Sequence, residues 1–215
     1  MNEKGVTVSI EPRKTGSATE RSAETRRRLL DAAAQAFADR GFHGTTTRDI
    51  AGAAGMSPAA VYVHYRSKEE LLFELSRAGH LKTIGNLDVN DDPDASPVDR
   101  LSAVMRGFAE WHARGHTTAR IVNYELAALE PEHRREIGLL RTEITRRVRA
   151  VVDAGIASGD FDIDDPHTTT TALLSMGIDI ARWYSLSGPL SPDEIADFYA
   201  MLALRVVGAR VRPSE

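Results

Sequence analysis

The chain of 215 residues is 42% hydrophobic and 6% aromatic, so it is long and apolar enough to bury the core of one large domain or two small ones. It has no cysteine, which excludes disulfides and thiol catalysis. It also has neither an uncharged apolar run of about 18 residues nor a leader pattern, so we expect a cytoplasmic protein without a membrane span. The formal net charge of −4 is unevenly distributed along the chain. Residues 1–78 hold 12 Lys or Arg against 10 Asp or Glu, whereas the remaining residues hold 15 against 21. This asymmetry favours a polyanionic partner for the N-terminal part.

The first 20 residues mix Gly, Ser, Thr, Pro and charges without periodicity, and we predict a disordered arm over 1–20. The basic residues Arg13, Lys14 and Arg21 could reach a minor groove beside a DNA-reading unit, and an inert tail is the alternative. A first helix is predicted over 23–40, with apolar residues on one face and a glycine directly after it.

Residues 45–72 contain two short helical segments joined by a three-residue turn. Thr47 is expected to cap the first helix, and Gly55 to supply the left-handed backbone at its end. Ser57 is expected to cap the second helix, with Pro58 at the first position, where a missing N–H costs nothing. Two helices in this arrangement form a helix-turn-helix, the unit that reads DNA.

The outer face of the second helix carries residues suited to DNA. Ala59 and Ala60 are small enough for the backbone to approach base edges, and their methyl groups can meet thymine methyls in a major groove. The hydroxyls of Tyr62 and Tyr65 and the imidazole of His64 suit phosphate oxygens. Core packing is the alternative for both tyrosines.

These motifs resemble the N-terminal domain of the TetR/AcrR family of transcriptional regulators over about residues 22–75. The resemblance rests on the order Thr-Thr-Thr-Arg-Asp-Ile-Ala, Gly-Met-Ser, Tyr-Val-His-Tyr and Ser-Lys-Glu-Glu-Leu-Leu. It implies that Thr47 and Arg48 contact the backbone or a base at the edge of the groove, and that Ala59, Ala60 and His64 face bases. It also implies that Tyr62 and Lys68 clamp phosphates, the lysine beside the exposed N–H groups of the next helix. The full set of candidate DNA contacts is Thr47, Arg48, Ser57, Pro58, Ala59, Ala60, Tyr62, His64, Tyr65 and Lys68.

The remainder of the chain is predicted to be helical. A helix continues to about residue 83, and a loop rich in Asp, Asn, Gly and Pro follows at 85–97. Further helices are expected at 97–114, 117–129, 131–158, 165–187 and 191–210. The predicted fold is therefore all-α, with a three-helix helix-turn-helix DNA-binding domain over 21–68 and a larger helical ligand-binding and dimerisation domain over 69–215.

The last two predicted helices each carry apolar residues at helical spacing, which indicates burial on a face that a chain of this size has difficulty covering by itself. The family resemblance implies that they pair with their symmetry mates as a four-helix bundle, which suits a palindromic operator. An intramolecular core is the alternative.

The middle helices mix large apolar groups with a few polar ones, as a small-molecule pocket requires, and a packed core with a polar rim is the alternative. The candidate ligand-binding residues are Met105, Phe108, Trp111, Arg120, Tyr124, Met176 and Trp183. Residues 181–190 resemble a subgroup of the family whose ligands are fatty-acyl or sterol-derived thioesters. That resemblance makes Arg120 or Arg182 a candidate for an anionic ligand group.

Other chemistry finds little support in the sequence. His112 and His116 have a spacing that can hold zinc, but no third ligand accompanies them, and we expect neither a metal nor a cofactor. Without a nucleophile elbow, phosphate loop or dinucleotide fingerprint, the chain is not expected to be an enzyme. We predict a homodimeric repressor that a small hydrophobic or acyl-thioester-like effector releases from a palindromic operator. The alternatives are a transcriptional activator, and a helical small-molecule-binding protein or enzyme without a regulatory role.

Overall fold

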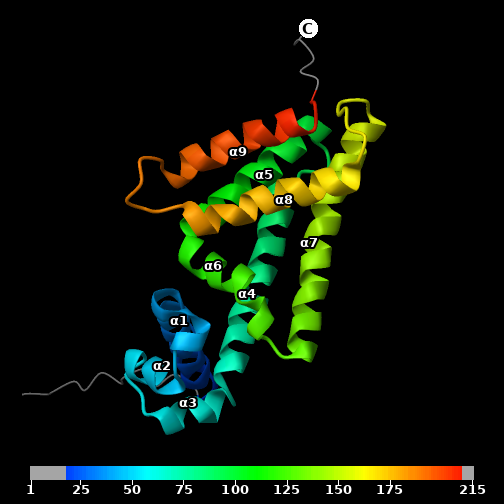
Figure 1. Ribbon diagram of the computed structural model, residues 1–215. Coiled ribbons are helices and arrows are strands. Elements are labelled where there is room, and N and C mark those ends of the chain that lie inside the picture. The colour runs from blue at the N-terminus through cyan, green and yellow to red at the C-terminus, as the bar shows by residue number, and fades with distance from the viewer. Residues whose placement is uncertain (1–17, 210–215) are drawn as a thin grey trace, which may run out of the picture.

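The computed structural model describes residues 18–209, and every regular element within that range is helical, as predicted. Helices α1 to α3 lie at one end of the molecule, α8 and α9 lie at the other, and the long helices α4 and α7 run between the two ends (Figure 1). The elements in chain order are α1 Ala18–Gly44, α2 Thr47–Ala53, α3 Pro58–His64, α4 Lys68–Asn90, α5 Pro97–Arg114, α6 His116–Tyr124, the 3-10 turn η1 Leu126–Ala128, α7 Pro131–Ala157, α8 Pro166–Trp183 and α9 Pro192–Val206.

Local signals set most helix ends of the N-terminal head, α1 to α3. Gly41, with φ of 71°, interrupts α1 where the sequence predicts its end, and Gly55, with φ of 67°, follows α2. Ser57 caps α3 by accepting a hydrogen bond from the backbone N–H of Ala60 at 3.2 Å. The cap of α2 is one residue earlier than predicted, because Thr46 forms a reciprocal capping box with the third residue of the helix.

The predicted arm is only partly described. Residues 1–17, which include Arg13 and Lys14, lie outside the described residues, whereas residues 18–20 belong to α1. The helix therefore begins five residues before the predicted start at residue 23.

The core of the head includes the first turns of α4. Leu71 and Leu72 are fully buried and belong to one apolar cluster with Ile50 of α2 and Val61 of α3. The helix that leaves the DNA-reading unit is thus packed into that unit by its first two turns. Its second half belongs to the larger helical body.

Helix α4 is longer than predicted, and the loop after it is shorter. It continues through the residues predicted as loop to Asn90, since Leu87 is buried and Ile84 packs against the core of the body. Burial of this apolar face outweighs the low helix propensity of the glycine and asparagine there. Asp91 then pairs with Arg100 of α5 at 2.7 Å, which closes the short connection.

The body is built around α5, which lies beside both α8 and α9 (Figure 1). Helix α8 approaches α5 closely at Gly177, where a Cβ added to the glycine would lie 2.6 Å from the ring of Phe108. At the outer side Arg106 of α5 pairs with Asp197 of α9 at 2.7 Å. None of the helices within residues 18–209 is long and apolar enough to cross a bilayer.

Candidate DNA-reading face and effector cavity

Helix α3 turns one side chain inward and most of the others outward. Val61 is fully buried and anchors the helix, whereas Tyr62 is 55% exposed and Val63 is 79% exposed. The predicted contacts Ser57, Pro58 and Ala59 are exposed, and Ala60 and His64 are half-buried. This geometry leaves a short apolar-and-phenolic surface that no described segment covers.

The start of α2 extends that surface. The Thr47 hydroxyl and the Tyr62 hydroxyl lie 3.1 Å apart and share a hydrogen bond, and Arg48 beside them is exposed. The bond fixes the phenol over the N-terminal end of α2, where free backbone N–H groups and the helix dipole favour an anion. The structure therefore brings Thr47 and Tyr62 together, and Arg48 follows Thr47 in α2.

Tyr65 requires a correction. Its side chain is only 1% exposed, its hydroxyl donates to the backbone carbonyl of Arg26 at 3.4 Å, and the Arg26 guanidinium lies 4.8 Å above the ring. Burial raises the pKa of the Tyr65 hydroxyl. The ring packs α3 against α1 and presents no surface to DNA, which is the alternative left open by the sequence.

Lys68, which the family resemblance assigns to a phosphate contact, makes structural contacts within the head. Its ammonium donates to the carbonyls of Phe42 and Thr45 at 2.7 and 2.9 Å, and it lies 4.3 Å from the centre of the Phe42 ring. An ammonium has three N–H donors, so one remains for a phosphate. The residue ties α4 to the connection between α1 and α2.

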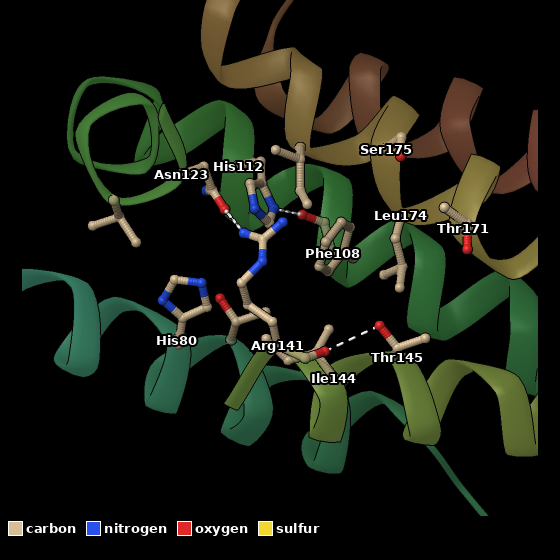
Figure 2. A pocket seen from close by; sticks show the side chains of 13 residues that line it. His80, Phe108, His112, Asn123, Arg141, Ile144, Thr145, Thr171, Leu174 and Ser175 are labelled. Atoms are coloured by element: carbon tan, nitrogen blue, oxygen red, sulfur yellow. Dashed lines mark hydrogen bonds between the residues drawn. The ribbon is translucent and has the colours of Figure 1, made fainter. Parts of the chain in front are cut away.

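A partly open cavity of about 120 Å³ lies in the body, lined by residues of α4, α5, α6, α7 and α8. Figure 2 shows the guanidinium of Arg141 reaching from α7 toward α5 and α6, with the hydroxyl residues Thr171 and Ser175 of α8 on the side of Leu174. The polar walls include His80, His112, Asn123 and Arg141, and the apolar walls include Phe108, Ile144, Leu174 and Ile178. None of the described residues that line it is acidic.

The charge in this cavity is unusual. Arg141 donates to the side-chain oxygen of Asn123 at 3.1 Å and forms no ion pair with a described carboxylate, and burial lowers the pKa of its guanidinium. Burial lowers the pKa of His112 to about 4, and burial, assisted by the charge of Arg141, also lowers the pKa of His80. At neutral pH the guanidinium is thus the one charge of the described cavity walls.

A second cavity of about 230 Å³ lies between the head and the body. It shares the wall residues Thr83, His112, Val122 and Asn123 with the first cavity. Its other side is formed partly by α1, through Asp31 and Ala34. The two cavities therefore adjoin at these four residues, and the second also contacts α1 of the DNA-reading head.

The structure distributes the seven predicted ligand residues widely. Phe108 lines the first cavity and Trp111 lines the second. The other five line neither: Met105 is core, Met176 packs against the core, Arg120 donates to the Ala38 carbonyl, Tyr124 donates to Asp179, and Trp183 is 49% exposed. Arg182, the other predicted anion contact, pairs with Asp179 at 2.8 Å.

His80 and Arg141 were not predicted from the sequence, although a signal was present. Arg141 lies four residues after buried Ile137 and three before buried Ile144, so it occupies an apolar position of α7. A charged residue at such a position is a candidate for ligand contact, because buried charges are normally paired.

Two hydrogen-bonded contacts tie the start of α4 to the start of α7. The Glu69 carboxylate accepts from the Nδ1 of His133 at 2.9 Å and from the backbone N–H of Glu130 at 2.9 Å. Potential metal-ligand atoms of these three residues lie within 4.8 Å of one another, and the Glu69–His133 ion pair accounts for two of the three. His112 and His116, whose spacing could hold zinc although no metal is expected there, each engage a backbone carbonyl through Nδ1.

The far end of the molecule exposes large apolar side chains on α8, α9 and the segment between them. They are Trp183, Leu186, Leu190, Phe198, Met201 and Val206, with exposed fractions between 36% and 70%. Apolar groups gathered on one end of a protein mark an interaction surface.

Comparisons with known proteins agree with this geometry. Residues 29–75 match the family described as bacterial regulatory proteins, tetR family, and residues 94–207 match the tetracyclin repressor-like C-terminal domain. The chain belongs to the TetR family of transcriptional regulators. The match at residues 94–207 alone spans more than half of the chain, so the family covers the body as well as the head.

Individual members of the TetR family are similar over most of their length. The HTH-type transcriptional repressor KstR2 of Mycolicibacterium smegmatis is 30% identical over 85% of this chain and 90% of its own. A tetR family regulatory protein from Rhodococcus RHA1 has a TM-score of 0.84 at 38% identity, over 87% of this chain and 99% of its own. AibR, solved in complex with isovaleryl coenzyme A and operator DNA, has a TM-score of 0.77 at 27% identity, over 86% of this chain and 100% of its own.

Proposed function

We propose that this TetR family regulator is a homodimeric repressor, without a catalytic role, that acts in the cytoplasm and leaves its operator when a small molecule occupies the body. The observation that carries the proposal is the course of α4, which joins the exposed reading unit to the effector cavity. Its first turns pack in the head, whereas His80 and Thr83 line the cavity. The relatives named as repressors, and the AibR complex with a ligand and DNA, support the same assignment.

The dimer is proposed to form through α8 and α9. Phe198 is 51% exposed and Met201 is 40% exposed on α9, and Leu186 in the preceding connection is 70% exposed. A two-fold axis through this surface would bury these groups against their copies and hold the two α3 helices at a fixed separation. A palindromic operator with half-sites one helical turn apart requires that separation to be about 34–36 Å.

Release is proposed to be a population shift. A ligand that contacts α4 near His80 favours whichever tilt of α4 fits it best, and the head moves with α4 because Leu71 and Leu72 are part of its core. The ligand shifts the equilibrium only by its difference in affinity for the two arrangements. We propose a small hydrophobic effector, free or as an acyl thioester, in line with the isovaleryl coenzyme A of the AibR complex.

The test is binding of the purified protein to duplex DNA, measured by fluorescence anisotropy. The probe is an inverted repeat from the intergenic DNA beside the gene, with a scrambled duplex as control. We expect preference for the repeat and a slope of log affinity against log salt of about −0.9 per neutralised phosphate. Equal affinity for both duplexes, or no salt dependence, would contradict the proposal.

A matched pair of variants locates the reading face. Tyr62→Phe removes the hydroxyl that bonds Thr47, and we expect a loss of about fivefold in affinity for all duplexes, as for one hydrogen bond. Val89→Thr changes an exposed residue near the end of α4, far along the chain from the reading unit, and should leave affinity unchanged.

The sign of the regulation is tested with a reporter gene under the control of the operator. Expression that rises rather than falls when the regulator gene is present would identify an activator.

A further inference from the structure

We propose that the cavity inside the body selects an amphipathic monocarboxylate, with the carboxylate paired to Arg141 and the apolar part against Phe108, Ile144 and Leu174. This inference rests on the proposed function in treating the cavity as the effector site, and it names the chemistry of the effector. The placement of these side chains around one space is visible in Figure 2.

The first argument is the missing counterion. The Arg141 guanidinium has five N–H donors, of which one is directed at the Asn123 side chain, and no described carboxylate forms an ion pair with it. A partly desolvated cation that has no carboxylate beside it among the described residues lowers the stability of the fold, and an anionic ligand that pairs with it removes that cost. A carboxylate matches the guanidinium fork with two parallel hydrogen bonds.

The second argument is an orphaned polar atom in the same place. The Nδ1 of His80 lies 2.7 Å from the Ser76 carbonyl, so Nδ1 carries the proton and Nε2 is an acceptor in the neutral ring. That Nε2 is buried and has no hydrogen-bond partner among the described residues. A hydroxyl of the ligand, or a water bound to its carboxylate, supplies the donor that Nε2 lacks.

The charge and the volume of the cavity restrict the class of ligand further. One guanidinium among otherwise uncharged walls balances one negative charge, which favours a monocarboxylate over a phosphate dianion. The cavity of about 120 Å³ is slightly smaller than an apolar cavity of ~150 Å³ that admits benzene. The apolar part of the ligand is therefore small, a short branched chain or at most a single ring that extends toward the open side of the cavity.

The test uses the full chain and isothermal titration with three acids, isovalerate, cyclohexanecarboxylate and benzoate, each beside its uncharged amide. We expect at least one acid to bind about tenfold or more tightly than its amide. Arg141→Met should abolish that preference. Arg149→Met, on the same helix but in an exposed pair with Asp153, is the matched control and should retain it.

Folding is checked by melting of the ligand-free proteins. Because Arg141→Met removes a desolvated charge, its melting temperature should equal or exceed that of the wild type. The inference is overturned if no acid binds at about 10 mM, if acid and amide bind alike, or if Arg141→Met keeps the preference. Binding of isovaleryl coenzyme A without binding of any of the three acids also overturns it.

Failure of this inference is distinguishable from failure of the proposed function. A protein that prefers the inverted repeat but shows no preference for acids keeps its regulatory assignment and loses the carboxylate site. A protein that binds acids through Arg141 but binds no duplex keeps the site and loses the regulatory assignment.

Discussion

Mild acid is expected to destabilise the protein through His112. The residue is 3% exposed, its Nδ1 lies 2.8 Å from the Phe108 carbonyl, and burial lowers its pKa from 6.5 to about 4. The unfolded chain therefore takes up the proton more readily than the folded one. The stability that depends on the neutral ring is complete above pH 6.5 and declines as the pH falls toward 4.

The size of the effect follows from the two pKa values. Between pH 7.5 and 5.5 the free energy of unfolding should fall by about 1.3 kcal/mol, which corresponds to about 3–5 °C in melting temperature for a chain of this size. The lowered pKa of His80 adds to the fall. His133 has the opposite effect on the pH dependence of stability. Desolvation of its ring lowers its pKa, but the hydrogen bond and charge of Glu69 outweigh this, so the pKa of His133 is raised. The stability that His133 contributes is present below pH 6.5 and is lost as the pH rises through its folded pKa.

The assay is thermal melting by circular dichroism at both pH values, for the wild type and His112→Gln. Glutamine keeps an N–H donor for the Phe108 carbonyl but does not titrate, so the difference between the two proteins isolates this ring. His43→Gln, at an exposed position, is the control and should melt like the wild type at both pH values. An equal fall in the wild type and in His112→Gln would refute the reasoning.

Three further outcomes are expected. Gly177→Ala would place a methyl group 2.6 Å from the Phe108 ring and should lower the free energy of unfolding in urea by about 1–3 kcal/mol, whereas an unchanged midpoint would show that α5 and α8 can separate freely. Lys68→Met removes two hydrogen bonds to carbonyls of the head and should cost about 1–3 kcal/mol in the same assay, together with weaker DNA binding. Wild-type stability would mean that these bonds contribute nothing. The double change Phe198→Asp and Met201→Asp should convert the dimer to a monomer in light scattering and weaken operator binding, and a dimer that persists would place the interface elsewhere.

Features that depend on neighbouring residues were predictable from the sequence. Ser57 and Pro58 begin α3, and Gly55 takes the left-handed conformation after α2, because caps and glycine turns are decided within a few residues. The prediction of α5 at 97–114 is confirmed for the same reason, since Ser96 caps the helix and a glycine follows it. The motifs that carry the family resemblance lie at residues 45–72, where the helix ends are set in the same local way.

Features that depend on distant contacts were not predictable in the same way. Local composition predicted a loop after residue 83, but the buried side of Leu87 keeps α4 helical to Asn90. The pattern left Tyr65 equally suited to core or DNA, and the core position is set by Arg26, 39 residues earlier.

The sequence by itself determined the family, the all-helical fold and the DNA-reading unit, since helix caps, turns and apolar periodicity are local properties. Only the tertiary structure showed the cavity that we propose as the effector site. Arg141, His80 and Phe108 come from three different helices, and only the packed body brings them around one space and leaves the guanidinium without a counterion among residues 18–209.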